Sequence, residues 1–62
     1  MTKAEFISAL EHELRLRGRA FSRADVQEFV ADACVWPLIV ENPDVHFWVR
    51  EFINRGRQST PA

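Results

Sequence analysis

The sequence predicts an all-α protein, a compact three-helix domain with helices at about residues 3–17, 23–35 and 43–55 and a proline-broken apolar connector at 36–42. Three observations support this prediction. Two segments have the residue order of a helix N-terminus, and apolar residues recur at helical intervals after each of them. In addition, 47% of the 62 residues are hydrophobic and 27% are charged, which is typical of a folded chain with one small core.

The first helix is predicted from the hydroxyl residue Thr2 and the acid Glu5 three positions later. The hydroxyl can accept a hydrogen bond from a free backbone N–H of the first turn, and the acid can bond back to the cap. Gly18 should end the helix, because glycine tolerates the left-handed conformation that often follows one. Glu11 is expected on the polar side. The core face consists of Phe6, Ile7, Leu10 and Leu14.

The second helix is predicted from the same pattern, with Ser22 as cap and Asp25 as the acid. Pro37 has no N–H to donate and its ring crowds the preceding turn, so the helix should stop near Val35 or Trp36. A short helical turn can follow in the connector. The core face of this helix is expected to contain Val26, Phe29, Val30, Ala33 and Cys34.

The third helix should open with Asn42 as cap and Pro43 at the first helical position, and it should end before Gly56. We therefore expect a single helical domain at 1–56 and a flexible C-terminal tail at 57–62. The core face of the third helix consists of Val45, Trp48, Val49, Phe52 and Ile53.

The residues that carry chemistry are sparse. Three small helices leave little room for a cleft, and Cys34 has no basic neighbour in sequence to activate its thiol. His46 should take a partly buried structural role at the edge of its helix's apolar face. The sequence has no Cys-x-x-Cys and no His pair at helical spacing. We therefore expect no enzymatic activity, no catalytic residue, no cofactor and no metal site.

Cysteine usage and the N-terminus bear on the cellular location. The lone Cys34 cannot form an internal disulfide, and the N-terminal residues include acids and lack the apolar segment of a secretory signal. Both features favour the cytoplasm. The eight consecutive apolar residues at 33–40 are fewer than half of the roughly 20 that a spanning helix needs, so no membrane partner is expected.

Several apolar residues exceed what a small core needs. Phe47 projects onto the polar side of its helix, and the connector must run near the surface. This surplus predicts a small helical protein-interaction module that self-associates or docks a protein partner. The predicted partner-binding residues are Val35, Leu38, Ile39, Val40 and Phe47.

An arginine patch around the first interhelical loop supports an alternative function. Arginine matches phosphate geometry, so Arg15, Arg17, Arg19 and Arg23 would suit a nucleic-acid-binding accessory domain. The simpler interpretation is that the first two complement the negative end of the helix dipole and the others solvate a loop. A net charge of -1 and the acids of the second helix argue against nucleic acid, which makes this the minority hypothesis.

Overall fold

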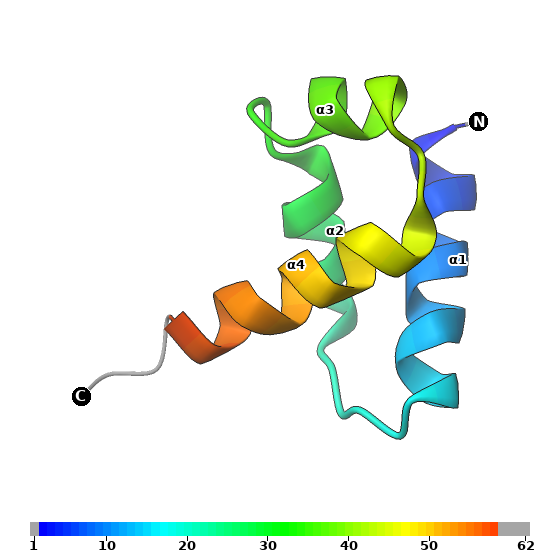
Figure 1. The fold of residues 1–62 in the computed structure, drawn as a ribbon, viewed down its shortest axis with the longest axis vertical. Coiled ribbons are helices and arrows are strands. Elements are labelled where there is room, and N and C mark those ends of the chain that lie inside the picture. Colours follow the sequence, from blue (N-terminus) through cyan, green and yellow to red (C-terminus); the bar gives the residue numbers. More distant parts are fainter. Residues whose placement is uncertain (1, 59–62) are drawn as a thin grey trace.

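The computed structural model describes the backbone of residues 2–58 and the side chains up to residue 55. This part of the chain is helical and contains no strand, which confirms the predicted all-α class. It forms four helices where three were predicted. The additional helix occupies the segment predicted as a connector (Figure 1). The helices are α1 (Lys3–Leu16), α2 (Arg23–Ala31), α3 (Trp36–Glu41) and α4 (Val45–Gln58).

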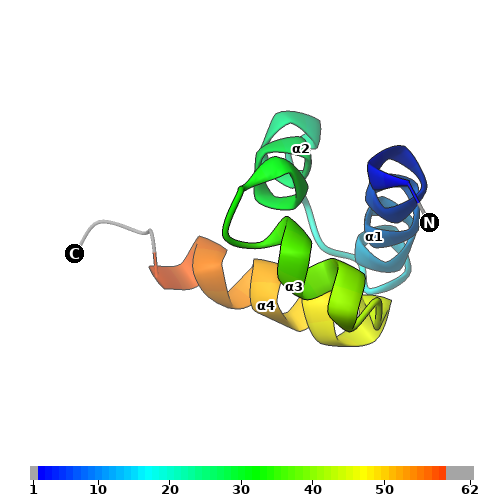
Figure 2. The same ribbon diagram turned by 90° about the horizontal axis from the view of Figure 1, so that it is seen from above.

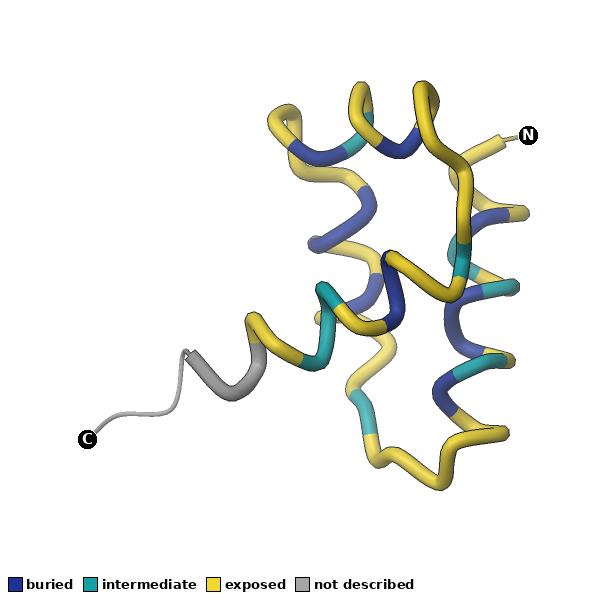
Figure 3. Tube along the Cα trace, viewed as in Figure 1, coloured by how far each residue is buried: buried dark blue, intermediate teal, exposed yellow. Residues whose placement is uncertain are grey.

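The arrangement of the helices produces one core. α1 and α2 lie side by side, α4 crosses both, and α3 lies across the end of the pair farthest from the α1–α2 turn (Figures 1 and 2). Buried positions from all these helices face the centre (Figure 3). Phe29 of α2 packs edge to face against Trp48 and Phe52 of α4, with ring centroids 6.2 and 5.4 Å apart. The buried apolar residues are Phe6, Leu10, Leu14, Val26, Phe29, Val30, Val35, Ile39, Trp48 and Val49.

The start of α1 has the predicted capping box. The backbone N–H of Glu5 donates to Thr2 Oγ1 over 3.1 Å, and the backbone N–H of Thr2 donates to Glu5 Oε1 over 2.8 Å. The pKa of Glu5 is lowered, chiefly because the Thr2 backbone N–H stabilises the charged carboxylate. Of the predicted core face, Phe6, Leu10 and Leu14 are buried, and Ile7 is partly buried and packs against them.

The end of α1 also follows the prediction. Gly18 has φ 68°, in the left-handed region. Its N–H donates to the Arg15 carbonyl, and the N–H of Arg19 donates to the Leu14 carbonyl, each over 3.0 Å. This pair of bonds is a Schellman motif, which satisfies carbonyl groups that the helix itself leaves free.

The start of α2 differs from its predicted capping box. Ser22 is the cap residue, but its side chain makes no capping hydrogen bond. Its carbonyl accepts from the Val26 N–H over 3.1 Å, so the backbone part of the cap is formed. Ser22 is exposed, and water can satisfy the free N–H groups of this first turn.

Asp32 ends α2 earlier than predicted. Its ψ of 126° leaves the helical region directly after Ala31. Asp32 Oδ1 then accepts from the Cys34 N–H over 2.7 Å, and the Asp32 carbonyl accepts from the N–H groups of Val35 and Trp36. Because this turn replaces the last predicted helical turn, Ala33 and Cys34 are exposed, and their predicted burial is wrong.

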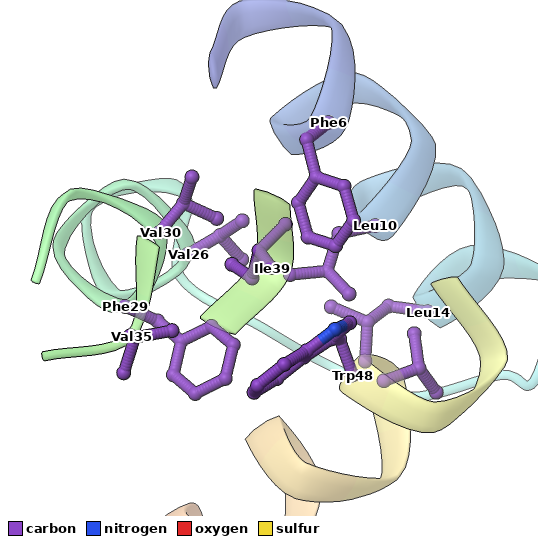
Figure 4. Packing of buried hydrophobic residues seen from close by; sticks show 10 residues of the cluster. Phe6, Leu10, Leu14, Val26, Phe29, Val30, Val35, Ile39 and Trp48 are labelled. Atoms are coloured by element: carbon purple, nitrogen blue, oxygen red, sulfur yellow. The ribbon is translucent and has the colours of Figure 1, made fainter. Parts of the chain in front are cut away.

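Pro37 begins a helix where it was predicted to end one. It is the second residue of α3, where the missing N–H would have no partner within the helix anyway. The new helix turns Ile39 inward, and Figure 4 shows its side chain between those of α1 and α2. The Leu38 and Ile39 N–H groups both donate to the Val35 carbonyl over 3.0 Å, which anchors the first turn.

The start of α4 is capped by Asp44 and not by Asn42 as predicted. Asp44 Oδ1 accepts from the His46 N–H over 3.1 Å, because the helix begins only at Val45. The Asn42 carbonyl instead accepts from Trp48 Nε1 over 2.7 Å, which satisfies the indole N–H.

The predicted inner face of α4 is confirmed. Trp48 and Val49 are buried, and the other three residues of that face pack against the core. The helix continues to Gln58, past the predicted end at residue 55. The remainder of the predicted tail, residues 59–62, lies outside the described residues.

The Schellman motif gives a direct test of the fold at the α1–α2 turn. Gly18→Ala should lower the free energy of unfolding by about 1 kcal/mol, because alanine is disfavoured in the left-handed conformation. No heavy atom lies within 4 Å of a Cβ built at this position, so a steric clash adds nothing. Urea denaturation measures the effect. Gly18→Asn should lower the free energy of unfolding by less than Gly18→Ala does, because asparagine tolerates the left-handed conformation better. A Gly18→Ala variant as stable as the parent would contradict the motif.

Candidate interaction surfaces

The predicted partner-binding residues of the apolar run divide into buried and exposed ones. Val35 and Ile39 are each 1% exposed, whereas Leu38 is 52% and Val40 is 60% exposed. The expectation that Val35 and Ile39 belong to a surface surplus is therefore wrong. For Val35 the expectation assumed that α2 continued to residue 35, and for Ile39 it assumed that the connector runs near the surface. The turn at Asp32 and the helix α3 that follows it place both side chains in the core.

The exposed residues of α3 do not form one patch. At about 100° per residue, Leu38 and Val40 lie on opposite flanks of a helix whose inner side is occupied by Ile39. Phe47 is 40% exposed and packs edge to face against Trp48, with ring centroids 4.9 Å apart. Leu16, at the other end of the fold, is 68% exposed.

One flank of α3 carries an apolar hollow. It has a volume of about 120 Å³ and is lined by Trp36, Ile39, Val40 and Pro43. Trp36 forms the wall nearest α1, where its ring meets that of Phe6 edge to face at 6.4 Å. Lys3 Nζ lies 5.7 Å from the centre of the Trp36 ring. We call this recess, with its four lining residues, the α3 hollow.

The four predicted arginines make different contacts. The Arg15 guanidinium lies 5.6 Å from the centre of the Phe21 ring, in a cation–π contact. Arg23 Nε lies 3.4 Å from Glu11 Oε2. The other two, Arg17 and Arg19, face a different hollow of about 240 Å³, which they line together with Arg50, Ile53 and Asn54.

Arg50 is a candidate that the sequence did not reveal. It is separated by more than thirty positions from Arg17 and Arg19. Only the crossing of α4 over α1 brings them to one hollow. No local spacing predicts that crossing.

Glu11 is buried, contrary to its predicted place on the polar side of α1. Only 3% of the residue is exposed, because α2 packs beside that side of α1. Its Oε2 atom has no hydrogen-bond partner among the described residues. The ion pair with Arg23 is therefore the contact that compensates the buried charge.

The histidines lie around a shallow hollow of about 470 Å³ between α1 and α4. His46 Nδ1 lies 3.0 Å from Glu13 Oε1, and its side chain is 72% exposed, so the predicted partly buried role is wrong. Within residues 2–58, no three His, Cys, Asp or Glu side chains gather as a metal site would require. Cys34 is exposed and pairs with no other cysteine.

The chain was compared with protein-family models, with curated proteins and with solved structures, and no match was found in any of the three comparisons. Among the described residues, no helix has the length and apolar character needed to cross a membrane.

The Glu11–Arg23 pair predicts a specific loss of stability. Arg23→Ala should lower the free energy of unfolding by about 1 kcal/mol, because it leaves the buried Glu11 carboxylate without its cation. Arg19→Ala is the matched control and should stay within about 0.5 kcal/mol of the parent. Thermal denaturation measures both.

Repeating the Arg23→Ala change in a Glu11→Gln background completes a double-mutant cycle. Because Glu11→Gln removes the buried charge, Arg23→Ala should then hardly change the free energy of unfolding. Equal losses from Arg23→Ala in both backgrounds would show that the ion pair contributes nothing.

Proposed function

We propose that this chain is a small, non-enzymatic helical interaction module that self-associates through the flank of α3 that carries the α3 hollow. The observation that carries the proposal is the exposure of Val40, which itself lines an apolar recess. Apolar surface of this kind is stabilised when a second apolar surface covers it. The core is already complete without Val40, so intramolecular packing does not account for its position.

A second copy of the chain is the occupant that the surface itself favours. Each chain offers both an exposed apolar side chain, Val40, and the recess that Val40 lines together with Trp36 and Pro43. Around a two-fold axis the same patch is used on both subunits, so the Val40 side chain of one copy would enter the recess of the other. A single sequence thus provides both the exposed valine and the recess that would receive it.

The charges near α3 support an antiparallel pairing of two copies. Lys3 lies at the Trp36 end of α3, and Glu41 is its last residue. Neither forms an ion pair within the described part of the chain. Because α3 is only about 9 Å long, antiparallel packing would place Lys3 of each copy near Glu41 of the other.

The proposed association is weak. The exposed apolar residues of one α3 flank fall well short of the roughly 1,000 Å² that a stable interface buries. A dissociation constant in the micromolar to millimolar range is therefore expected. Leu38 and Phe47 remain exposed candidates for contact with a different protein, since neither lines the α3 hollow.

The alternative, a nucleic-acid-binding accessory domain, has less support. Arg15 and Arg23 already contact Phe21 and Glu11, and neither lines the hollow of Arg17 and Arg19. A nucleic-acid interface needs several cations along one track. The contacts of Arg15 and Arg23 leave only two of the four predicted arginines for such a track.

Sedimentation equilibrium from about 10 μM to 1 mM tests the proposal. The parent chain should show a reversible monomer–dimer equilibrium, and Val40→Ser should weaken it by about tenfold or more, because a buried valine would be lost from each subunit. Leu16→Ser is the matched control, since it removes an exposed apolar residue at the other end of the fold. A strict monomer at 1 mM, or equal effects of the two variants, would reject this interface.

Charge reversal tests the antiparallel orientation separately. Lys3→Glu alone should weaken the dimer, and Lys3→Glu combined with Glu41→Lys should restore it. Failure of the double reversal to restore association would contradict the antiparallel arrangement while leaving the Val40 contact in place.

A further inference from the structure

Three arginines meet where the end of α1 approaches α4. Arg17 and Arg19 flank Gly18, and the Schellman bonds of that turn fix the backbone from which both side chains leave. Arg50 reaches the same hollow from α4. We call the residues lining this hollow of about 240 Å³ the arginine hollow; they are Arg17, Arg19, Arg50, Ile53 and Asn54.

The arginine hollow carries positive charge that the described residues do not neutralise. None of its three arginines forms an ion pair among the described residues, and all nine acidic side chains of the sequence lie in that part of the chain. All three arginines are exposed, and their convergence on one hollow creates a positive local potential that attracts an anion. The dipole of α1 accounts for a cation at Arg17, but Arg50 belongs to the middle of another helix.

We propose that the arginine hollow binds the phosphate monoester of a phosphorylated protein segment. A phosphomonoester carries a charge of about -1.5 to -2 at neutral pH and three strong acceptor oxygens. Guanidinium groups match those oxygens with paired N–H donors, and the Asn54 amide can supply another donor. The volume of about 240 Å³ has room for one such group with some of its water.

The surroundings of the hollow favour a phosphorylated protein over nucleic acid. Within the described residues the arginines of the hollow surround a single recess, whereas a nucleic-acid strand needs a track of cations and aromatic rings on which bases stack. No aromatic residue lines the hollow. The nearby Arg15 and Arg55 already lie over the rings of Phe21 and Phe29. An isolated phosphate held by an arginine cluster is a known mode of phosphopeptide recognition.

Calorimetric titration with a short Gly/Ala peptide that carries one phosphoserine tests the proposal at low salt. The peptide should bind, its unphosphorylated counterpart should not, and inorganic phosphate should compete with it. Binding should weaken as the pH falls from about 7.5 to about 5, because the phosphate loses charge near pH 6. Arg17→Gln and Arg50→Gln should each weaken binding by about tenfold.

Two control variants give the test its specificity. Arg15→Gln removes a neighbouring arginine outside the hollow and should leave binding unchanged. Arg50→Lys keeps the charge but loses the planar fork, so its affinity should fall between those of the parent and Arg50→Gln. Circular dichroism establishes that each variant is folded.

Three results would overturn the proposal. The phosphopeptide could fail to bind, or its binding could be indifferent to Arg17→Gln and Arg50→Gln. A single-stranded oligonucleotide that binds more tightly than the phosphopeptide through the same arginines would assign the hollow to nucleic acid. None of these readouts depends on the α3 hollow, so dimerisation and phosphate binding succeed or fail independently.

Discussion

The turn at Asp32 is the interaction on which the rest of the structure depends. Asp32 accepts the Cys34 N–H on its carboxylate and two further N–H groups on its carbonyl, and it thereby ends α2 and forms the turn that leads into α3. Val35 and Ile39 then enter the core, while Leu38 and Val40 remain outside. The same turn allows α3 to cover one end of the α1–α2 pair (Figure 1). Both the completed core and the proposed α3 surface therefore follow from one local hydrogen-bonding arrangement.

Local sequence patterns predicted the helices and their inner faces well, because capping and amphipathic spacing act over a few residues. Thr2, Gly18 and the buried face of α4 all conform to that expectation. The prediction failed in the apolar run, where composition alone does not reveal which residue ends a helix. Asp32 carried a usable signal, since an aspartate can form a turn with the N–H two residues on. Pro37 led to the prediction that α2 ends near Val35 or Trp36, whereas α2 ends at Ala31 and Pro37 lies in the first turn of α3.

The candidate surfaces were less predictable than the helices, since they depend on contacts between distant segments. Glu11 is buried only because α2 packs over it, and Arg50 joins the loop arginines only because α4 crosses α1. The two proposed surfaces are well separated. The arginine hollow includes the turn that follows α1, and the α3 hollow lies beyond the opposite end of that helix (Figure 1). A dimer formed through α3 would leave the arginines free to bind an anion.

The division of the apolar run into core and surface is the central claim, and mutational thermodynamics tests it most directly. Urea denaturation at low protein concentration should show that Ile39→Val costs about 1 kcal/mol, because it removes a buried methylene group from a packed core. Leu38→Ala and Val40→Ala remove more apolar volume from exposed positions and should each change stability by less than about 0.5 kcal/mol. If Leu38→Ala or Val40→Ala lowered the free energy of unfolding as much as Ile39→Val or more, the division of the apolar run into core and surface would be contradicted.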